Sequence, residues 1–348
     1  EINFSVKQAF VMINMTWCLI AFFGAIPLSM STLDMSFTDA FFESMSGITT
    51  TGSTVITGLN NAPPGILLWR ALLQWLGGIG IIIMAMSVLP FLNVGGMQIF
   101  RSELAENNEK AMPRTTQLAS SIGLIYIVLT LLCIICYIAS GLDTFDALAH
   151  AMTTISTGGF STFDTSFTNF NNAATEIVAI IFMIGGSLPF VLYLKAIHGN
   201  PKPLYKDIQV RWFFSIITIA IIALTAYLVI AEGEFMGEAL RRSSFNVISL
   251  ITGTGYVNEN YGIWGSFPIC ILFFLMAVGG CAGSTTCGIK MFRFQVFYEI
   301  AKVQIRRLIY PNGVFIAHYN GKALSQAIPT SVLSFLFIYA LTFTIVTL

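Results

Sequence analysis

Charged side chains are scarce in this sequence. Lys and Arg together number 17, as do Asp and Glu, so that only 10% of the 348 residues are charged; an ordinary soluble domain has roughly 25%. Hydrophobic residues make up 55% of the chain, and the mean hydropathy is +0.78. This composition excludes an ordinary soluble domain and predicts an integral membrane protein.

Residues that carry chemistry are also few. The only histidines, His150, His198 and His318, are scattered, and no phosphate-binding glycine loop, catalytic triad or basic stripe for nucleic acid occurs. Cys133 and Cys136 form a C-x-x-C, but they lie in the middle of an apolar run, where they act as small hydrophobes. We therefore expect no enzyme, no metal centre of His and Cys, no covalently bound cofactor and no nucleic-acid partner.

Long apolar runs are what the chain has instead. A helix needs roughly 20 apolar residues to cross about 30 Å of hydrocarbon. The sequence predicts seven such crossings, one of them interrupted, in an all-α integral membrane fold with lipid around it, and no cleaved signal peptide. They fall near residues 9–29, 66–92, 117–140, 175–194, 212–231, 264–280 and 324–348.

The charges are unevenly distributed between the predicted loops. Most basic residues lie after the second apolar run of each pair or before the first run of the chain. By the positive-inside rule, we expect these loops and the N-terminus to be cytoplasmic. The opposite loops are mainly acidic and should concentrate cations at the outer face. Their carboxylates are Asp34, Asp39, Glu43, Asp143, Asp146, Asp164, Glu232, Glu234, Glu238 and Glu259, against Arg70, Arg241 and Arg242.

A short polar unit recurs three times between the apolar runs. Each copy has an apolar stretch followed by alternating hydroxyl and glycine residues, so that Gly52, Gly159 and Gly255 correspond to one another. The copies are "DAFFESMSGITTTGSTV" at 39–55, "DALAHAMTTISTGGFST" at 146–162 and "SSFNVISLITGTGYVNE" at 243–259.

We interpret each copy as a re-entrant element. A helix such as residues 40–51 would extend about 18 Å, too short to cross the membrane. Irregular backbone at membrane depth is tolerated only where protein buries it or where it lines a watery cavity. Glycine lets successive carbonyls point one way, and a ring of carbonyls can replace the hydration shell of a monovalent cation. The alternative is that the glycines only allow close helix packing.

At these residues the chain resembles the Trk/Ktr/HKT superfamily of potassium transporters, and is most similar to the TrkH type. The residues that carry the resemblance are "FFESMSGITTTGSTV", "LLWRALLQWLGGIGIIIM" at 67–84, "TTISTGGFSTFD", "LITGTGY" and "GGCAGSTTCGIKMFR" at 279–293. The resemblance implies four pseudo-symmetric repeats of membrane helix, re-entrant pore helix and membrane helix around one pore. It also implies potassium as substrate, a homodimer, a cytoplasmic nucleotide-binding regulatory ring protein, and the bacterial cytoplasmic (inner) membrane as location.

By the same resemblance, a K⁺-binding filter is formed by three turns. Its residues are Thr50, Thr51, Gly52 and Ser53 in the first, Thr157, Gly158, Gly159 and Phe160 in the second, and Gly253, Thr254, Gly255 and Tyr256 in the third. The repeats correspond to residues 1–100, 101–200, 201–310 and, incomplete, 311–348. The resemblance places a fourth filter roughly twenty residues beyond Leu348 and two further crossings before Glu1, so we expect a longer protein or a truncated relative.

The crossing predicted at 264–280 runs into a stretch of small residues that should not stay helical. Glycine costs about 1 kcal/mol relative to alanine in a helix, and Ser and Thr compete for backbone hydrogen bonds. The resemblance makes this stretch an intramembrane gate, although it could instead be a glycine-rich packing face. Its residues are Gly279, Gly280, Cys281, Ala282, Gly283, Ser284, Thr285, Thr286, Cys287 and Gly288.

The resemblance and the sequence lead to further expectations about this loop and the residues after it. A loop that is displaced by a cytoplasmic partner should make few packing contacts. Cys287 stands where the resemblance leads us to expect glycine, and Lys290 should reach the cytoplasmic interface or a carboxylate, because a charge at membrane depth is unfavourable. A helix should resume near Lys290 and continue to about Leu308.

The favoured function is potassium uptake through a selective pore. The alternatives are an ion-coupled secondary transporter, which usually has inverted or paired repeats, and a truncated non-conducting relative or regulatory subunit. Glycines alone do not decide between K⁺ and Na⁺, nor do they identify a coupling ion or the regulatory nucleotide.

Overall fold

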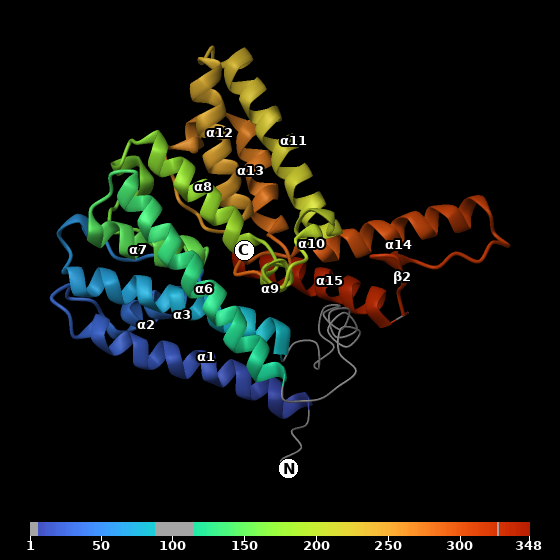
Figure 1. Cartoon of the computed structure of the whole chain (residues 1–348), viewed down its shortest axis with the longest axis horizontal. Helices are drawn as coiled ribbons and strands as arrows, with labels where there is room; N and C mark the ends of the chain where they lie inside the picture. Colours follow the sequence, from blue (N-terminus) through green and yellow to red (C-terminus); the bar gives the residue numbers. More distant parts are fainter. Residues whose placement is uncertain (1–5, 88–113, 326) are drawn as a thin grey trace.

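The computed structural model describes residues 6–87, 114–325 and 327–348, and it is predominantly helical, as predicted (Figure 1). The long helices are α1 (Val6–Ser29), α3 (Pro64–Ser87), α6 (Arg114–Ala139), α11 (Ile208–Ala231), α14 (Met291–Ile309) and α15 (Ala327–Thr347). The shorter ones are α2 (Phe37–Ile48), α7 (Thr144–Ile155), α8 (Ala173–Ser187), α9 (Phe190–Ile197), α10 (Lys202–Lys206), α12 (Met236–Ile251) and α13 (Ser266–Val278). Single 3-10 turns are η1 (Leu59–Asn61), η2 (Ser166–Asn169) and η3 (Tyr261–Ile263), and β1 (His318–Tyr319) pairs antiparallel with β2 (Lys322–Ala323).

The helices form successive groups along the chain, which we call units. In Figure 1, α1, α2 and α3 lie together, followed by α6, α7 and α8 and then by α11, α12 and α13. In each unit the short second helix packs against the long helix before it. The largest buried apolar cluster joins the second and third units through residues such as Tyr137, Phe167, Phe213 and Phe245.

The first short helix is shifted relative to the predicted segment 40–51. It begins at Phe37 because the Ser36 side chain accepts a hydrogen bond from the Asp39 backbone N–H, an N-cap. It ends at Ile48 because Thr50 takes a left-handed backbone with φ 55°. The half-length character is nevertheless as predicted.

The prediction of seven crossings is only partly correct. Within the described residues, five helices are long and apolar enough to span a membrane: Lys7–Ser29, Pro64–Ala85, Gln117–Ala139, Ile208–Ala231 and Ala327–Thr347. The run near 66–92 is helical to Ser87, and its remainder lies outside the described residues. The run near 264–280 forms only the 13-residue helix α13.

The predicted crossing at 175–194 is broken, which the sequence analysis missed. Helices α8 and α9 meet at an angle of 92° around Leu188 and Pro189. Proline has no backbone N–H and disfavours helix in the residue before it, so "GGSLPF" held a signal for this break. Counted as one bent span, the pair raises the number of candidate spans among these residues to six.

The predicted repeat boundaries stay predictions. The boundary at 200/201 falls in the short connection between α9 and α10, and the one at 310/311 directly follows α14. The boundary at 100/101 lies outside the described residues.

In the first two units, glycines let the short helix approach the helix that follows it. A Cβ at Gly77 in α3 would overlap the carbonyl oxygen of Ile48, the last residue of α2. In the second unit a Cβ at Gly186 would lie 2.8 Å from the carbonyl oxygen of Ile155, the last residue of α7. Small residues at helix contacts are typical of membrane proteins, because they let backbones come close.

We predict that Gly77→Ala destabilises the fold. The added methyl group must displace the α2 backbone, and overpacking of this kind typically costs about 1–3 kcal/mol. The matched control is Gly80→Ala in the same helix, where the nearest atom is a Trp17 side-chain carbon at 3.6 Å. Thermal unfolding of the purified proteins in detergent should show a lower midpoint for Gly77→Ala only; equal midpoints would contradict the close contact.

Candidate functional site

The three short helices end in turns with the same backbone pattern. The second residue after each helix is left-handed, with φ 55° at Thr50, 50° at Thr157 and 73° at Gly253. Two residues further on, a glycine is left-handed again, with φ 83° at Gly52, 80° at Gly159 and 79° at Gly255. The left-handed region favours glycine, and Thr50 and Thr157 occupy it without that advantage.

Backbone hydrogen bonds close the first two turns in the same way. The N–H of Thr50 donates to Gly47 and that of Thr51 to Ser46, both at 2.9 Å, which is the pattern of a Schellman motif. In the second unit, Thr157 and Gly158 donate likewise to Thr154 and Thr153.

The third turn differs by one residue. Gly253 donates to Leu250, but the carbonyl of Ser249 accepts from Gly255 at 3.1 Å instead of from Thr254. The three predicted turns therefore have left-handed residues at the same positions, but the third differs in one backbone hydrogen bond.

The turns lie side by side. A Cβ at Gly52 would overlap the carbonyl oxygen of Gly158, and a Cβ at Gly159 would overlap that of Thr254. Among the described residues, nothing lies within 4 Å of a Cβ at Gly255. The structure thus brings the first turn against the second and the second against the third.

The aromatic side chains of the turns are buried in the neighbouring unit. The Phe160 ring lies 3.4 Å from a Cβ position at Gly47 in α2, and it is 4% exposed. The Tyr256 hydroxyl lies 2.5 Å from Thr153 Oγ1 in α7. Phe160 and Tyr256 can therefore offer only their backbone to an ion, whereas Ser53 in the first turn is exposed.

A polar residue at one position of each short helix bonds to the segment that follows the turn, and the sequence analysis did not recognise this shared position. Glu43 Oε2 accepts from the Val55 N–H, and His150 Nε2 lies 3.0 Å from Ser161 Oγ. Asn246 Nδ2 donates to Asn258 Oδ1 at 2.7 Å. Each stands seven residues before the left-handed residue of its turn, so the repeat spacing could have revealed the position.

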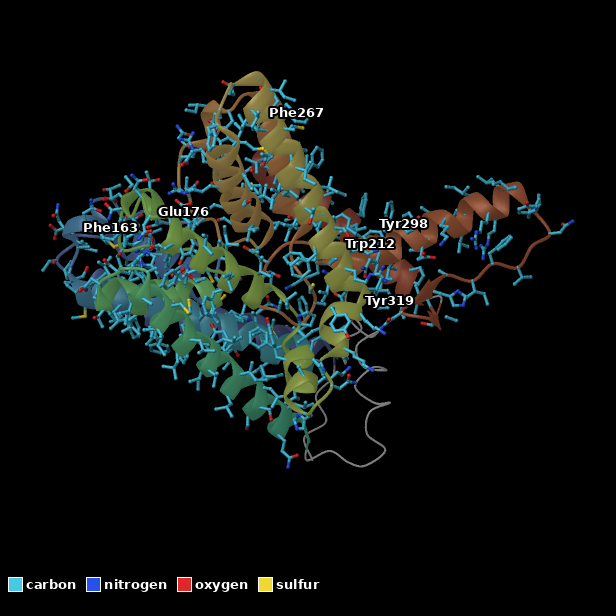
Figure 2. The ribbon with its side chains drawn as sticks, turned by 45° about the horizontal axis from the view of Figure 1, so that its top comes forward. Phe163, Glu176, Trp212, Phe267, Tyr298 and Tyr319 are labelled. Carbon is cyan, nitrogen blue, oxygen red and sulfur yellow. The ribbon has the colours of Figure 1, made fainter. Side chains whose placement is uncertain are left out.

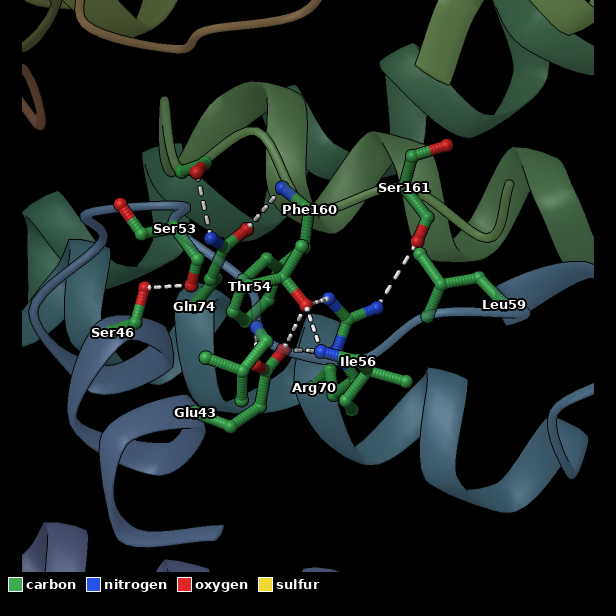
Figure 3. Close-up of polar contacts among 12 residues, drawn as sticks. Glu43, Ser46, Ser53, Thr54, Ile56, Leu59, Arg70, Gln74, Phe160 and Ser161 are labelled. Carbon is green, nitrogen blue, oxygen red and sulfur yellow. Dashed lines mark hydrogen bonds and ion pairs between the residues drawn. The ribbon is translucent and has the colours of Figure 1, made fainter. Parts of the chain in front are cut away.

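Arg70 of α3 forms a buried ion pair within the first unit and also contacts the second unit (Figure 3). Its Nε donates to Glu43 Oε1 at 2.7 Å, and the two side chains are 1% and 0% exposed. Its Nη1 donates to the Ser161 carbonyl, and its guanidinium lies 4.1 Å from the centre of the Phe160 ring. The predicted outer charges of Arg70 and Glu43 are thus structural and not exposed to solvent.

Most of the other side chains predicted to form the outer face also have structural partners. Arg241 donates two hydrogen bonds to Glu176 of α8, a carboxylate that was not among those predicted for this face and is labelled in Figure 2. Arg242 pairs with Glu234 and Glu259, and burial raises the pKa of the Glu259 carboxyl while Arg242 opposes that shift. Asp143 caps α7, Asp164 accepts from the N–H groups of Gly58 and Leu59, and the Asp39 carboxylate accepts from the Ser36 hydroxyl. The predicted outer face therefore has fewer unpaired carboxylates to attract cations than the sequence alone indicates.

The predicted break after α13 is present. Helix α13 ends at Val278, and α14 begins at Met291 and continues to Ile309, close to the predicted limits. Between them, Gly279 and Gly288 pack backbone against backbone.

The expectation that this loop makes few packing contacts is wrong. Cys281, Ser284 and Thr285 are at most 1% exposed. The N–H groups of Cys281 and Thr285 donate to the carbonyls of Ser187 and Gly186, the last two residues of α8 before the bend to α9. The backbone carbonyls at the end of α8, which have no helical partner because the helix is broken there, thus accept hydrogen bonds from the loop that follows α13.

The loop also touches the second turn. Thr157 Oγ1 donates to Thr285 Oγ1 at 3.1 Å, and Thr285 Oγ1 contacts the carbonyls of Ile155 and Gly186. The exposed Cys287 has its Sγ 3.8 Å from the Gly253 carbonyl. The Lys290 ammonium donates to the Thr286 carbonyl and forms no ion pair with a carboxylate of the described residues, whereas its predicted approach to the cytoplasmic interface stays a prediction.

Together, the spanning helices and the turns folded back between them define an integral membrane protein. The comparisons then identify its family. The family model TrkH, described as a cation transport protein, matches residues 1–348. The chain therefore belongs to the TrkH family, which is one of transporters and not of enzymes.

Similar proteins agree with this assignment. The Trk system potassium uptake protein TrkI of Halomonas elongata is 40% identical, over 96% of this chain and 68% of the relative. TrkG of Escherichia coli K12 is 35% identical, over 98% and 71%. The crystal structure of the potassium transporter TrkH from Vibrio parahaemolyticus matches with a TM-score of 0.90 and 32% identity, over 99% and 71%.

We predict that Arg70→Met is far more damaging than removal of both charges. Losing one partner of a buried ion pair typically costs about 3–5 kcal/mol, because the other charge remains buried without compensation. The double variant Glu43→Gln, Arg70→Met should recover much of that loss. Unfolding midpoints of the purified proteins measure both; a double variant no more stable than Arg70→Met would contradict the pairing.

Proposed function

We propose that this protein takes up potassium across the cytoplasmic membrane through a selective pore. The family and the names of the relatives, which are potassium uptake proteins, support potassium as the substrate. The single observation that carries the mechanism is the contact between three turns of alternating left-handed backbone, each at the end of a short helix.

The chemistry of these turns suits a monovalent cation. Carbonyl oxygens ordered by a fixed backbone can replace the hydration shell of a K⁺ ion. The short helices α2, α7 and α12 end at the turns, so that their negative dipole ends lie beside the proposed ion path. In this proposal the backbone of residues 50–53, 157–160 and 253–256 forms three parts of a ring, and residues 279–288 form the gate.

Two other functions are weighed against uptake through a pore. A secondary transporter usually has inverted or paired repeats, whereas each of the three units here begins with a long helix and continues with a short helix that ends in a turn of left-handed residues. A regulatory, non-conducting subunit would not need three similar turns in contact. The homodimer and the cytoplasmic nucleotide-binding partner rest on the resemblance alone and are part of the proposal.

The proposed gate must break specific hydrogen bonds to move. Its backbone N–H groups are bonded to the carbonyls of Gly186 and Ser187, and the Ala282 N–H is bonded to Gln209 Oε1 at 3.0 Å. Coupling free energies in regulated proteins are typically about 1–3 kcal/mol. A partner that contributes this much free energy can open the loop if its closed state is only slightly more stable than its open state. The hydrogen bonds oppose the movement, so the loop is not free to move by itself.

We predict that Gly159→Ser lowers the preference for potassium over sodium. The added side chain would overlap the Thr254 carbonyl, and φ at this position is 80°. We expect the ratio of K⁺ to Na⁺ uptake to fall about tenfold, which corresponds to about 1.4 kcal/mol. The ratio is measured in bacterial cells that have no other potassium uptake system.

The control for this variant is Gly58→Ser. Gly58 has φ 79°, but nothing lies within 4 Å of its Cβ position, so the backbone strain is matched without the overlap. Its uptake ratio should stay near that of the wild type. An unchanged ratio in Gly159→Ser at normal expression would remove Gly159 from the filter.

A separate prediction concerns the contact between loop and turn. Thr285→Val keeps the shape of the side chain but removes the hydroxyl that joins Thr157 to Ile155 and Gly186. We expect resting potassium flux in reconstituted protein to rise several-fold. Ser284→Ala is the control, because its hydroxyl bonds only within the loop, to Cys281 and Thr286. Equal flux in both variants would argue that the contact does not restrain the gate.

A further inference from the structure

Gln74 connects the first unit to the second turn. It lies in α3 and is fully buried, and its side-chain Nε2 donates to the Gly158 carbonyl at 2.7 Å. Its Oε1 accepts from the Phe160 N–H at 3.0 Å, and both bonds are drawn in Figure 3. One amide group therefore holds the two peptide groups on either side of Gly159.

The amide is matched to what this piece of backbone needs. Gly158 and Phe160 are buried, and a buried carbonyl or N–H without a partner costs about 1–3 kcal/mol. A carboxamide supplies one donor and one acceptor from one rigid plane. Neither a carboxylate nor an aliphatic side chain of the same length can satisfy both peptide groups.

Gln74 also explains why the second turn has two adjacent glycines. The residue before the shared glycine is Thr51 in the first turn and Thr254 in the third, but Gly158 in the second. A Cβ at Gly158 would overlap the Gln74 amide. Gly158 therefore makes room for Gln74, whereas Gly159 makes room for the Thr254 carbonyl.

The arrangement is particular to this contact and is not a general feature of the repeat. Gln74 stands three residues before Gly77, and the corresponding residue of α8, three before Gly186, is the fully buried Met183. The contact between the second and third turns is secured instead by the Tyr256 hydroxyl and Thr153. Replacement of the amide by an apolar side chain is thus compatible with the packing of a unit.

Gln74 lies where the first two turns meet. The Gly158 carbonyl that it binds is the one that a Cβ at Gly52 would overlap, and Gln74 Nε2 is 3.8 Å from that Cβ position. The amide therefore sets both the direction of the Gly158 carbonyl and the spacing between the two turns. We propose that Gln74 is a positioning residue that determines cation selectivity by fixing the backbone around Gly159.

This inference rests on the proposed potassium uptake, and its test separates the two. Gln74→Met retains side-chain length but loses both hydrogen bonds. Gln74→Glu retains an acceptor for Phe160 N–H and turns a second carboxylate oxygen toward the Gly158 carbonyl. The matched control is Trp75→Phe, which removes a hydrogen bond from Nε1 to Thr130 Oγ1, at 3.0 Å, that does not touch the turns.

Potassium and sodium uptake are measured for the full-length protein in cells lacking other potassium uptake, with expression and unfolding midpoint alongside. We expect both Gln74 variants to lower the ratio of K⁺ to Na⁺ uptake about tenfold, and the affinity for K⁺ with it, while Trp75→Phe retains the wild-type ratio.

A lower midpoint with an unchanged ratio in either Gln74 variant would show a merely structural role and overturn this inference, as would the same change of ratio in Trp75→Phe. A wild-type protein without preference for potassium would overturn the proposed function itself, and the selectivity role with it.

Discussion

The turns between the short helices and the following crossings depend on one constraint, which is that every buried peptide group must find a partner inside the protein. At membrane depth no water is available to replace a lost hydrogen bond. Helices meet this requirement by themselves, but residues 50–53 and 157–160 cannot. Side chains of α2 and α3 bind the Ser53 and Gly158 carbonyls and the Phe160 N–H, so the shape of these turns is determined in part by their neighbours.

The same constraint explains the buried charges beside the first turn. Glu43 can accept from Thr54 Oγ1, the Val55 N–H and Arg70 at once because a carboxylate offers two oxygens and several lone pairs. His150 and Asn246 stand at the same position of their helices and make fewer hydrogen bonds than Glu43 to the segments that follow the turns. The support therefore occupies the same position in the three units but differs in chemistry, and beside the first turn Arg70 extends it to the Ser161 carbonyl of the second unit.

Local features could be predicted from the sequence, and contacts between distant segments could not. The helical membrane class, the half-length helices and the break after Val278 follow from composition and from runs of small residues. The bend at Pro189 had a local signal that was missed, since the apolar run around it looked continuous. The contacts of Gln74 with residues 158 and 160 span more than eighty positions, and no periodicity marks such a pair. For the same reason, the small residues of "GSTTC" led to the prediction of a loop with few packing contacts, although the loop is hydrogen-bonded to the carbonyls of Gly186 and Ser187.

The two broken crossings are best understood as one structure. Each break leaves backbone groups without helical partners, and the groups of one break bond to those of the other, as in the bond from the Phe190 N–H to the Gly283 carbonyl at 3.0 Å. Thr285 adds the end of α7 to the same set of contacts. A displacement of residues 279–288 must therefore free the carbonyls of Ile155 and Gly186, which border the second turn. In the proposed pore, the gate and the filter are thus joined through shared hydrogen bonds, and a change in one alters the free energy of the other.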